Sequence, residues 1–514
     1  MIRRHIFWII HFFCINGLLV AQPSIQWQQS FGGLKKDSAR SVKQTRDRGF
    51  IVIGYTLSTD GDITGPIGGG DWWILKISDT GEKEWERTLG GMSTESAYDV
   101  AIADDGGYVV VGETYSADVN VSFNHGDRDI WAVKLDSIGN IQWEKTYGGT
   151  QSESGYSIKQ TPDQGFIICG STSSNDGDIS QYLGFTDVWV IKADKNGTIE
   201  WEQTYGGSDG DERGYCIDLT NDGGYIFTGE TNSTNGDITE ALGNTDAWVV
   251  KLNGVGEIQW QKTLGGFASD KGWEIKQSYS GEFVMVGYWG SGDAIPNWHG
   301  LYDYWLTKLD SNGNVIWERI YGGTNDDWAQ TFGFYPNGDI VIAGATRSID
   351  GDVTQNDGIQ DIWLIKVDSN GTLLWEKSIG GNGPEIAFDL CFANESDVII
   401  VGESSIVSGD VSSNMGSTDF WIVKLAPETS ATQTPTAIPL NLYPNPATHW
   451  ITLNLPIIEQ DMQVNITDEQ GKLLQSRSIR TDEKLDISAL PSGVYWVSAV
   501  SKSGQVYAGK FVRG

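Results

Sequence analysis

The stretch Ile141-Gln-Trp143-Glu-Lys-Thr-Tyr147-Gly-Gly149 contains the motif that decides the fold, Trp-x-x-x-x-Gly-Gly. This motif occurs seven times, and successive copies begin 57 to 59 residues apart, at Trp27, Trp85, Trp143, Trp201, Trp260, Trp317 and Trp375. A period this regular is typical of repeat architectures, in which each unit buries its apolar faces against its neighbours. The sequence therefore predicts a repeat protein.

A second motif, Asp-x-Trp followed by apolar residues and Lys, keeps the same period. Its tryptophans are Trp73, Trp131, Trp189, Trp248, Trp305, Trp363 and Trp421. Within one repeat, the β-branched and aromatic runs 95–103, 108–115, 130–135 and 141–147 are separated by turns rich in Gly, Asn and Asp. This pattern predicts a four-stranded antiparallel meander, with an outer fourth strand that has one wet face.

The ends of the repeat region predict how the units close. The chain enters at Ile25-Gln-Trp27, which matches a fourth strand alone, and the seventh copy ends at Leu425, on a third strand. The N-terminal strand then completes the last unit and removes the open edges. We therefore expect an all-β fold, a seven-bladed β-propeller over residues 22–425. The motif tryptophans would pack between blades, and the Gly-Gly pairs would cross to the next blade.

Two segments outside the repeats predict export and a second domain. Residues 1–21 read as a secretory signal peptide, because Arg3 and Arg4 precede an apolar stretch that ends at Ala21. Residues 426–438 form a linker rich in Thr, Pro and Ala. Beyond it the repeat is lost, and short strand-like runs in residues 439–514 predict a small immunoglobulin-like β-sandwich.

This last segment resembles a known family, the type A C-terminal sorting domain of the type IX secretion system of Bacteroidota. The resemblance rests on Ile466-Thr-Asp468, Gly471-Lys472, Asp486-Ile487, the final Phe511-Val512, and the sorting motif Tyr443, Pro444, Asn445, Pro446, Gly493, Tyr495 and Lys510. It implies export across the inner membrane by the signal peptide, then across the outer membrane with the type IX secretion machinery as partner. The mature protein is thus expected to be secreted or held at the cell surface.

Composition narrows the range of partners. The chain carries 68 acidic and 35 basic residues, a net charge of −33, which argues against nucleic acid as a ligand. The signal peptide aside, no apolar run reaches membrane length, so no integral membrane segment is expected in the mature chain. Cys169, Cys216 and Cys391 fall on inner strands of different blades and are expected to act as small buried hydrophobic residues, with a Cys169–Cys216 bridge as the alternative.

The long loops join the second and third strands of each repeat, and we call the face that carries them the long-loop face. It is the default functional surface. A carboxylate opens every first strand, at Asp37, Glu95, Glu153, Glu212, Asp270, Asp327 and Glu385. Three loops contain Asp-Gly-Asp, and their carboxylates are Asp60 and Asp62, Asp176 and Asp178, and Asp350 and Asp352. These oxygen-rich loops suggest calcium binding as one interpretation and capping of backbone N–H groups as the other.

The fifth repeat departs most from the pattern, and departures are the best guide to an asymmetric site. Its first strand and long loop contain an unusual number of ring side chains, and the sixth repeat adds one more. The set is Trp273, Trp289, Trp298, His299, Tyr302 and Trp328. Aromatic side chains beside carboxylates and amides suit sugar recognition. A loop that packs its own aromatics is the alternative interpretation.

The sequence favours a non-enzymatic module that binds a glycan or a protein. The alternative is a polysaccharide-degrading enzyme that uses two carboxylates of the long-loop face, for which Asp211 and Asp326 are the loose candidates. No histidine-based zinc site or triad is indicated, because His125 and His299 lie on distant repeats. No cofactor is predicted apart from the calcium alternative.

Overall fold

The computed structural model describes residues 22–290, 298–394, 396–428, 438–454, 462–468, 472–479, 484–500 and 506–514. The expected signal peptide and most of the linker lie outside these residues. The chain divides into two compact units, one over Gln22–Glu428 and one within Thr429–Gly514. The described residues form β-strands and no helices, and none of their elements is a helix that could cross a membrane.

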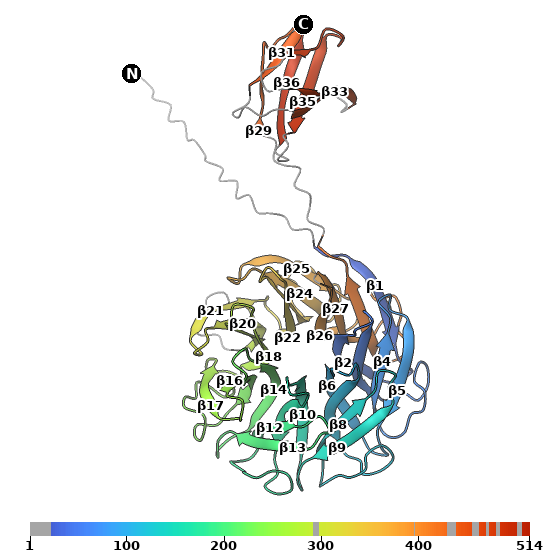
Figure 1. The fold of residues 1–514 in the computed structure, drawn as a ribbon, viewed down its shortest axis with the longest axis vertical. Helices are drawn as coiled ribbons and strands as arrows, with labels where there is room; N and C mark the ends of the chain where they lie inside the picture. The colour runs from blue at the N-terminus through green and yellow to red at the C-terminus, as the bar shows by residue number, and fades with distance from the viewer. Residues whose placement is uncertain are drawn as a thin grey trace. The chain divides into compact units, whose positions relative to one another are not determined.

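The first unit contains seven four-stranded antiparallel sheets arranged in a ring as a β-propeller (Figure 1). We number them sheet 1 to sheet 7 in chain order of their first strands. The first strands, which lie innermost, are β2 (Asp37–Gln44), β6 (Glu95–Ile102), β10 (Glu153–Gln160), β14 (Glu212–Leu219), β18 (Lys271–Gln277), β22 (Asp327–Phe334) and β26 (Ile386–Ala393). The second strands are β3 (Phe50–Thr56), β7 (Tyr108–Thr114), β11 (Phe166–Thr172), β15 (Tyr225–Thr231), β19 (Phe283–Trp289), β23 (Ile340–Thr346) and β27 (Asp397–Ser404).

The outer half of each sheet follows the same repeat. The third strands are β4 (Asp71–Ile77), β8 (Asp129–Leu135), β12 (Asp187–Ala193), β16 (Asp246–Leu252), β20 (Asp303–Leu309), β24 (Asp361–Val367) and β28 (Asp419–Leu425). The fourth strands are β5 (Lys83–Leu89), β9 (Ile141–Tyr147), β13 (Ile199–Tyr205), β17 (Ile258–Leu264), β21 (Val315–Tyr321), β25 (Leu373–Ile379) and β1 (Ile25–Phe31).

Sheet 7 is completed by the N-terminal strand. Its order is β1-β28-β27-β26, and β1 pairs antiparallel with β28 from Ile25 opposite Leu425 to Phe31 opposite Phe420. The amide of Ala426 donates to the carbonyl of Ser24 at 2.8 Å. The chain therefore enters and leaves this unit at the same end of one strand pair.

The apolar core lies between neighbouring sheets. One cluster joins Val52 and Trp73 of sheet 1 to Val401 and Phe420 of sheet 7, and similar clusters fill the five successive interfaces from sheet 1 to sheet 6. The tryptophans of the third strands are completely buried there. The three described cysteines are free, with Cys169 and Cys216 buried, so they act as small core residues.

The tryptophans of the fourth strands bind the neighbouring sheet at its outer turn. Trp143 donates its indole N–H to the carbonyl of Lys195, in the turn before β13, at 3.2 Å. Trp85 lies against the equivalent turn at Gly139, where φ is +85° and a Cβ atom would come within 3.0 Å of the indole ring. The turn therefore requires glycine, and the motif tryptophans do pack between sheets.

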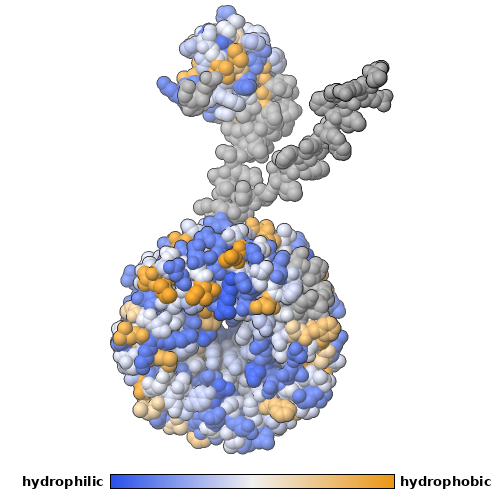
Figure 2. All heavy atoms as spheres, turned by 180° about the vertical axis from the view of Figure 1, so that it is seen from behind, coloured by the Kyte–Doolittle hydropathy of each residue, from blue (hydrophilic) through white to orange (hydrophobic). Residues whose placement is uncertain are grey.

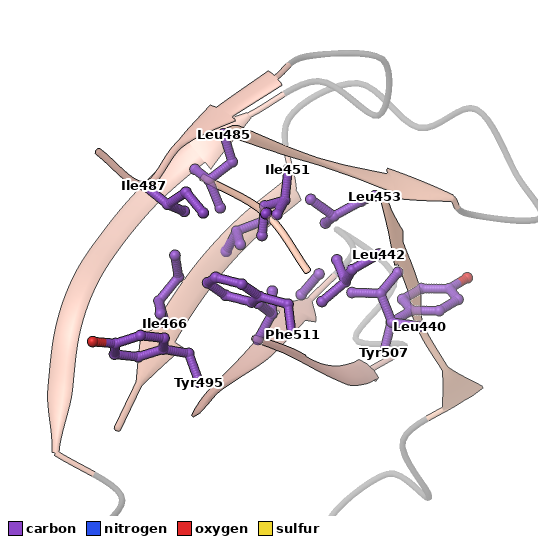
Figure 3. Close-up of a cluster of buried hydrophobic side chains, with 14 of the residues drawn as sticks. Leu440, Leu442, Ile451, Leu453, Ile466, Leu485, Ile487, Tyr495, Tyr507 and Phe511 are labelled. Atoms are coloured by element: carbon purple, nitrogen blue, oxygen red, sulfur yellow. The ribbon is translucent and has the colours of Figure 1, made fainter. Parts of the chain in front are cut away.

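The second unit contains two sheets. A five-stranded sheet has the order β29 (Ile438–Pro439), β36 (Val506–Arg513), β35 (Gly493–Val500), β32 (Met462–Thr467) and β33 (Leu473–Ile479). A three-stranded sheet consists of β30 (Asn441–Tyr443), β31 (Trp450–Asn454) and β34 (Lys484–Asp486). Side chains of both sheets meet in one core, with Ile451 and Leu485 from one side and Ile466 and Phe511 from the other (Figure 3).

Candidate functional site

A cavity of about 160 Å³ lies on the propeller axis, and all seven first strands line it. Each of these strands carries a β-bulge at the same place in the repeat. A bulge breaks the strict alternation of a strand, so two successive side chains of each strand reach the axis. The bulged residues form the upper ring of the cavity: Arg40, Tyr98, Tyr156, Tyr215, Trp273, Gln330 and Phe388.

Four residues of the upper ring form a continuous aromatic arc. The ring centroids of Tyr98 and Tyr156 are 5.2 Å apart, those of Tyr156 and Tyr215 are 5.5 Å apart, and those of Tyr215 and Trp273 are 4.4 Å apart. All four side chains are half-buried. The indole N–H of Trp273 has no hydrogen-bond partner among the described residues. The arc thus combines apolar ring faces with one unused donor.

Arg40 occupies the same upper ring and is unpaired. Its guanidinium carbon lies 3.9 Å from the ring centroid of Phe388 and 5.6 Å from that of Tyr55. No hydrogen bond or ion pair joins Arg40 to any residue that the structure describes, and its Nε is buried without a partner. The guanidinium is therefore held between aromatic rings with its N–H groups unused.

The carboxylates above the upper ring are already paired with cations. Glu113 binds Arg128 at 3.3 Å, and Glu403 binds Lys36 at 3.2 Å. Glu230 binds Lys271 at 2.7 Å and accepts a hydrogen bond from the Tyr215 hydroxyl at 2.6 Å. None of these groups neutralises Arg40.

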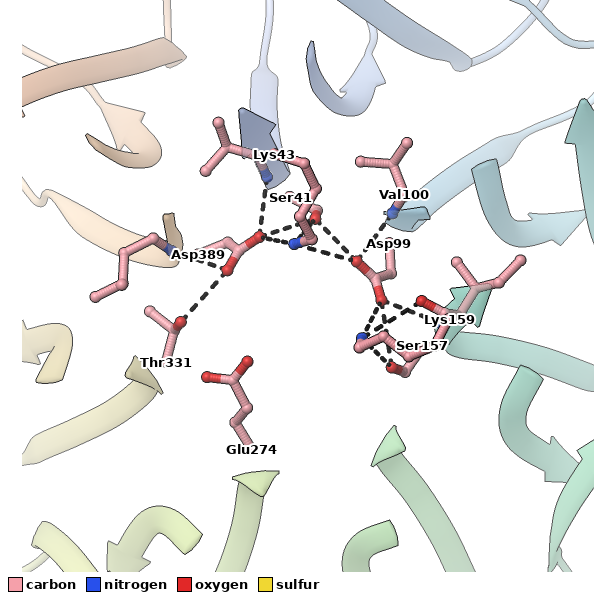
Figure 4. A network of polar contacts seen from close by, with 12 residues as sticks. Ser41, Lys43, Asp99, Val100, Ser157, Lys159, Glu274, Thr331 and Asp389 are labelled. Carbon is pink, nitrogen blue, oxygen red and sulfur yellow. Dashed lines mark hydrogen bonds and ion pairs between the residues drawn. The ribbon is translucent and has the colours of Figure 1, made fainter. Parts of the chain in front are cut away.

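The next residue of each first strand forms a lower ring, which is polar in every sheet except sheet 4, where it is Cys216 (Figure 4). The Ser41 hydroxyl lies 2.9 Å from Asp99 and 2.8 Å from Asp389, so it can donate its proton to either carboxylate. Lys43 lies 2.7 Å from Asp389 and 3.5 Å from Asp99, and Lys159 lies 3.2 Å from Asp99. The carboxylates in turn accept backbone N–H groups of the next sheet, as at Val42 with Asp389 and Ile158 with Asp99.

These ion pairs keep the lower ring charged. Burial by itself would raise the pKa of the Asp99 carboxyl, but Lys159 and Lys43 hold it well below its usual range. Burial would lower the pKa of the Lys43 ammonium, and Asp389 and Asp99 instead raise it. Glu274 is bound to Lys276 at 2.8 Å and to the amide of Phe332 at 2.8 Å. The lower ring is therefore a set of fixed charges that joins the bulges of neighbouring sheets.

The aromatic residues predicted from the fifth and sixth repeats lie in different places. Trp273 is in the upper ring, and Trp328 is half-buried at the start of β22 with the guanidinium of Arg347 4.8 Å from its ring centroid. Trp298 and His299 are exposed on the long loop, of which residues 291–297 lie outside the described part. Tyr302 packs on Tyr288 at 4.9 Å between ring centroids.

The structure corrects the prediction that Trp289 belongs to the ligand-binding aromatic group. It is only 3% exposed, lies in the core between sheets, and packs on Trp305 at 5.1 Å between ring centroids. Trp289 is the last residue of β19, where alternation turns its side chain into the sheet interface. It cannot stack on a surface ligand.

The Asp-Gly-Asp loops bind the Gly-Gly crossings through backbone amides. In the third repeat, Asp176 accepts the amide of Thr150 at 2.8 Å and Asp178 accepts that of Gly148 at 3.1 Å. In the first repeat, Asp60 accepts the amide of Leu34 at 2.8 Å. Each loop is therefore fixed to the crossing that precedes the first strand of its own sheet.

Asp62 and Asp352 cap backbone amides in the same way as their partners, as the capping interpretation expects. Asp62 accepts the amide of Gly32 at 3.3 Å and is ion-paired with Lys83, also at 3.3 Å. Asp352 accepts the amide of Gly322 at 3.2 Å, and Asp350 accepts that of Thr324 at 2.8 Å. Among the described residues, no group of three His, Cys, Asp or Glu is placed to hold a metal ion. The carboxylate oxygens cap backbone N–H groups of the adjacent Gly-Gly crossing.

The carboxylates that open the first strands are not surface groups. All seven have an exposed fraction of 0%, and each hydrogen-bonds within the fold, as Glu95 does with the amide of Gly91 at 2.9 Å. Glu95 faces Asp71 across Gly90, where a Cβ atom would lie 2.4 Å and 2.5 Å from their oxygens. These seven carboxylates therefore do not contribute to the surface of the long-loop face, because the Gly-Gly crossing covers them.

Burial in such pairs changes the protonation of the carboxylates. It raises the pKa of Asp303 and Glu385 to about 7, with a further contribution from the partner carboxylate. It raises the pKa of Asp361 and Asp419 to about 6. Asp211 and Asp326, the two candidate residues for hydrolysis, do not line the axial cavity. Asp326 is instead ion-paired with Arg347 at 3.3 Å.

The sorting motif residues lie on β30 and the segment after it, on β35 and on β36. Asn445 donates to the carbonyl of Lys510 at 3.0 Å and accepts the amide of Val512 at 2.9 Å, so the Tyr443–Pro446 segment is fixed to β36. Tyr495 is buried, stacks on Phe511 and donates to the carbonyl of Pro491 at 2.7 Å. Lys510 is exposed beside Trp496.

Residues 441–513 match the family model described as the secretion system C-terminal sorting domain. The protein is exported by the type IX system. Its destination is the cell surface or the medium, and the sorting domain implies contact with the secretion machinery.

Other relatives are distant. The regulatory protein FlaEY of Caulobacter vibrioides is 23% identical over 403 residues, which are 69% of this chain and 41% of the relative, so the chain spans about two fifths of its length. Among solved structures, the Pan2 WD40 domain of Neurospora crassa is 9% identical with a TM-score of 0.42, over 75% of this chain and 88% of that domain. The extracellular domain of BT4673 from B. thetaiotaomicron is 12% identical with a TM-score of 0.36, over 93% of this chain and 58% of that one. These likenesses assign no activity.

Proposed function

We propose that the mature protein is a seven-bladed β-propeller, with an immunoglobulin-like sorting domain behind a linker, that acts as a non-enzymatic binding module for a glycan or a protein. The domain boundaries are residues 1–21, 22–425, 426–438 and 439–514. The ligand enters the axial cavity from the long-loop face. One observation carries this proposal: the upper ring of the cavity combines aromatic faces with two groups of unused donors, on Arg40 and Trp273.

The pattern suits binding because ligand pockets are typically apolar surfaces with a few polar groups that fix orientation. Buried donors without partners are rare in folded proteins, and a bound ligand is one way to satisfy them. Figure 2 shows a hollow at the centre of one face of the ring. Trp298, exposed on the long loop of sheet 5, is the candidate for a second contact on the long-loop face.

The cavity favours binding over hydrolysis. Its carboxylates Asp99, Asp389 and Glu274 are each ion-paired with a lysine. A glycosidase needs one carboxyl group that keeps its proton near neutral pH to protonate the leaving group. Lys159 and Lys43 hold the pKa of Asp99 well below its usual range, so this carboxylate does not suit that role.

A glycan array with the mature chain, residues 22–514, tests the proposal. We expect selective binding that Trp273→Leu weakens tenfold or more, because such a change removes about 1.4 kcal/mol or more from a stacking contact. Trp298→Ala is expected to weaken binding less. Trp496→Ala, an exposed tryptophan of the sorting domain, is the matched control.

Parallel runs with calcium and with a chelator separate a metal requirement from the capping role of the Asp-Gly-Asp loops. An array without any bound glycan, together with no capture of surface protein from the producing cells, would refute the proposed binding function. Release of reducing sugar from a bound polysaccharide would instead support the enzyme alternative.

A further inference from the structure

We propose that the upper ring binds a single carboxylate-bearing sugar ring, a hexuronic acid at the end of an acidic glycan, with Arg40 on the carboxylate and Trp273 on a hydroxyl. This inference rests on the proposed binding function and names its ligand class.

Arg40 is the group that selects an anion. Every other described cation of the cavity and its rim has a carboxylate partner: Lys43, Lys159, Lys276, Lys271, Arg213 and Arg128. Arg40 stays without one although the chain has a net charge of −33. A half-buried charge without a counter-ion is costly, so an anionic ligand would compensate it.

The geometry around Arg40 favours a planar anion. Phe388 lies under the guanidinium at 3.9 Å, which covers one face and leaves the edges to donate. The parallel N–H groups of a guanidinium match the two oxygens of a carboxylate. Stacking also limits the rotamers of Arg40, so less conformational entropy is lost when the ligand binds.

The size and walls of the cavity favour a sugar ring. The volume of about 160 Å³ is close to that of a cavity of roughly 150 Å³ known to admit a six-membered ring. The arc Tyr98–Tyr156–Tyr215–Trp273 offers ring faces for the apolar face of a pyranose. The free indole N–H of Trp273 requires an acceptor, which a sugar hydroxyl supplies. An acidic peptide offers the carboxylate but no ring for the arc.

The test is calorimetric titration of the mature chain with trigalacturonate, with neutral galactotriose, and with a tri-glutamate peptide. We expect trigalacturonate to bind at least tenfold more tightly than the other two. Arg40→Gln should remove this preference, and Arg40→Lys should keep only part of it because a lysine cannot donate to both oxygens. Trp273→Phe keeps a ring and loses the N–H donor, so it should weaken the uronate. Arg46→Gln, an arginine bound to the carbonyl of Asp104 on an exposed turn, should change nothing.

The outcomes separate this inference from the proposed function. Equal binding of galactotriose and trigalacturonate, unaffected by Arg40→Gln, would overturn the inference and leave the binding function standing. So would tight binding of the glutamate peptide through Arg40, which would assign the cavity to acidic protein. Binding of glycans on the array that Trp273→Leu does not weaken would also overturn it. A melting curve for Arg40→Gln excludes loss of the fold, and Arg40→Lys gives the same answer if the Gln variant is unstable.

Discussion

Deletion of Ile25–Gly33 removes β1 and should open the ring. The six residue pairs of β1 with β28 correspond to about six backbone hydrogen bonds, worth roughly 0.5–1.5 kcal/mol each. Phe31 is 9% exposed and Trp27 packs on the same core cluster, and burial of each such side chain adds about 1.5–3 kcal/mol. The loss is comparable to the roughly 5–15 kcal/mol that stabilises a typical domain.

We therefore expect the deleted chain to melt at least on the order of 10 °C lower by circular dichroism, and to aggregate through the exposed edge of β28. A synthetic peptide of residues 22–33, added during refolding, should restore the melting temperature by strand addition. A scrambled peptide of the same composition should not. An unchanged melting curve for the deletion, measured on a monomeric sample, would refute the closure of sheet 7 by β1.

Deletion of residues 439–514 should leave the propeller folded and trapped in the periplasm, because Gln22–Glu428 is a compact unit by itself; fractionation that finds normal amounts outside the cell would contradict this. Trp305→Ala should cost about 3–5 kcal/mol by denaturant melting, since the side chain is fully buried, and a shift as small as that of Trp298→Ala would contradict it. Thermal stability should rise as pH falls from 8 to about 5, because Asp303 and Glu385, with pKa near 7, are protonated in the folded state before the unfolded one. Below about pH 4 it should fall again, because the folded-state pKa of Asp99 is held well below its usual range and the unfolded chain binds the proton first; a melting temperature that declines steadily from pH 8 to 5 would count against the buried pairs.

Most of the strand pattern of one repeat could be predicted. The run 141–147 coincides with β9, and the run 108–115 exceeds β7 by one residue. Tryptophan spacing and Gly/Asp turns are local signals, so the sequence alone is enough to predict the strands and turns of one repeat. The short strands β29, β30 and β34 cannot be predicted from the sequence, because runs of two or three residues show no period.

The candidate site was less predictable. A bulge adds one residue to a strand, and nothing in the run Lys271-Gly-Trp273-Glu-Ile275 distinguishes it from ordinary alternation. The sequence therefore does not place the upper ring on the axis, although it shows a common position: the third residue after the opening carboxylate is aromatic in five repeats and Arg40 or Gln330 in the others. The burial of Asp37 and its equivalents also depends on backbone N–H groups from the Gly-Gly crossing, which residue types alone do not place.

The position of β28 has a mechanical consequence. The chain leaves the propeller from this strand, which is paired with β27 on one side and β1 on the other. A pull on the chain beyond Leu425, while a ligand holds the ring, would have to break two hydrogen-bonded ladders instead of peeling away a single edge strand. A force between a ligand bound in the cavity and the chain beyond Leu425 would therefore act on a strand that is hydrogen-bonded along both of its edges.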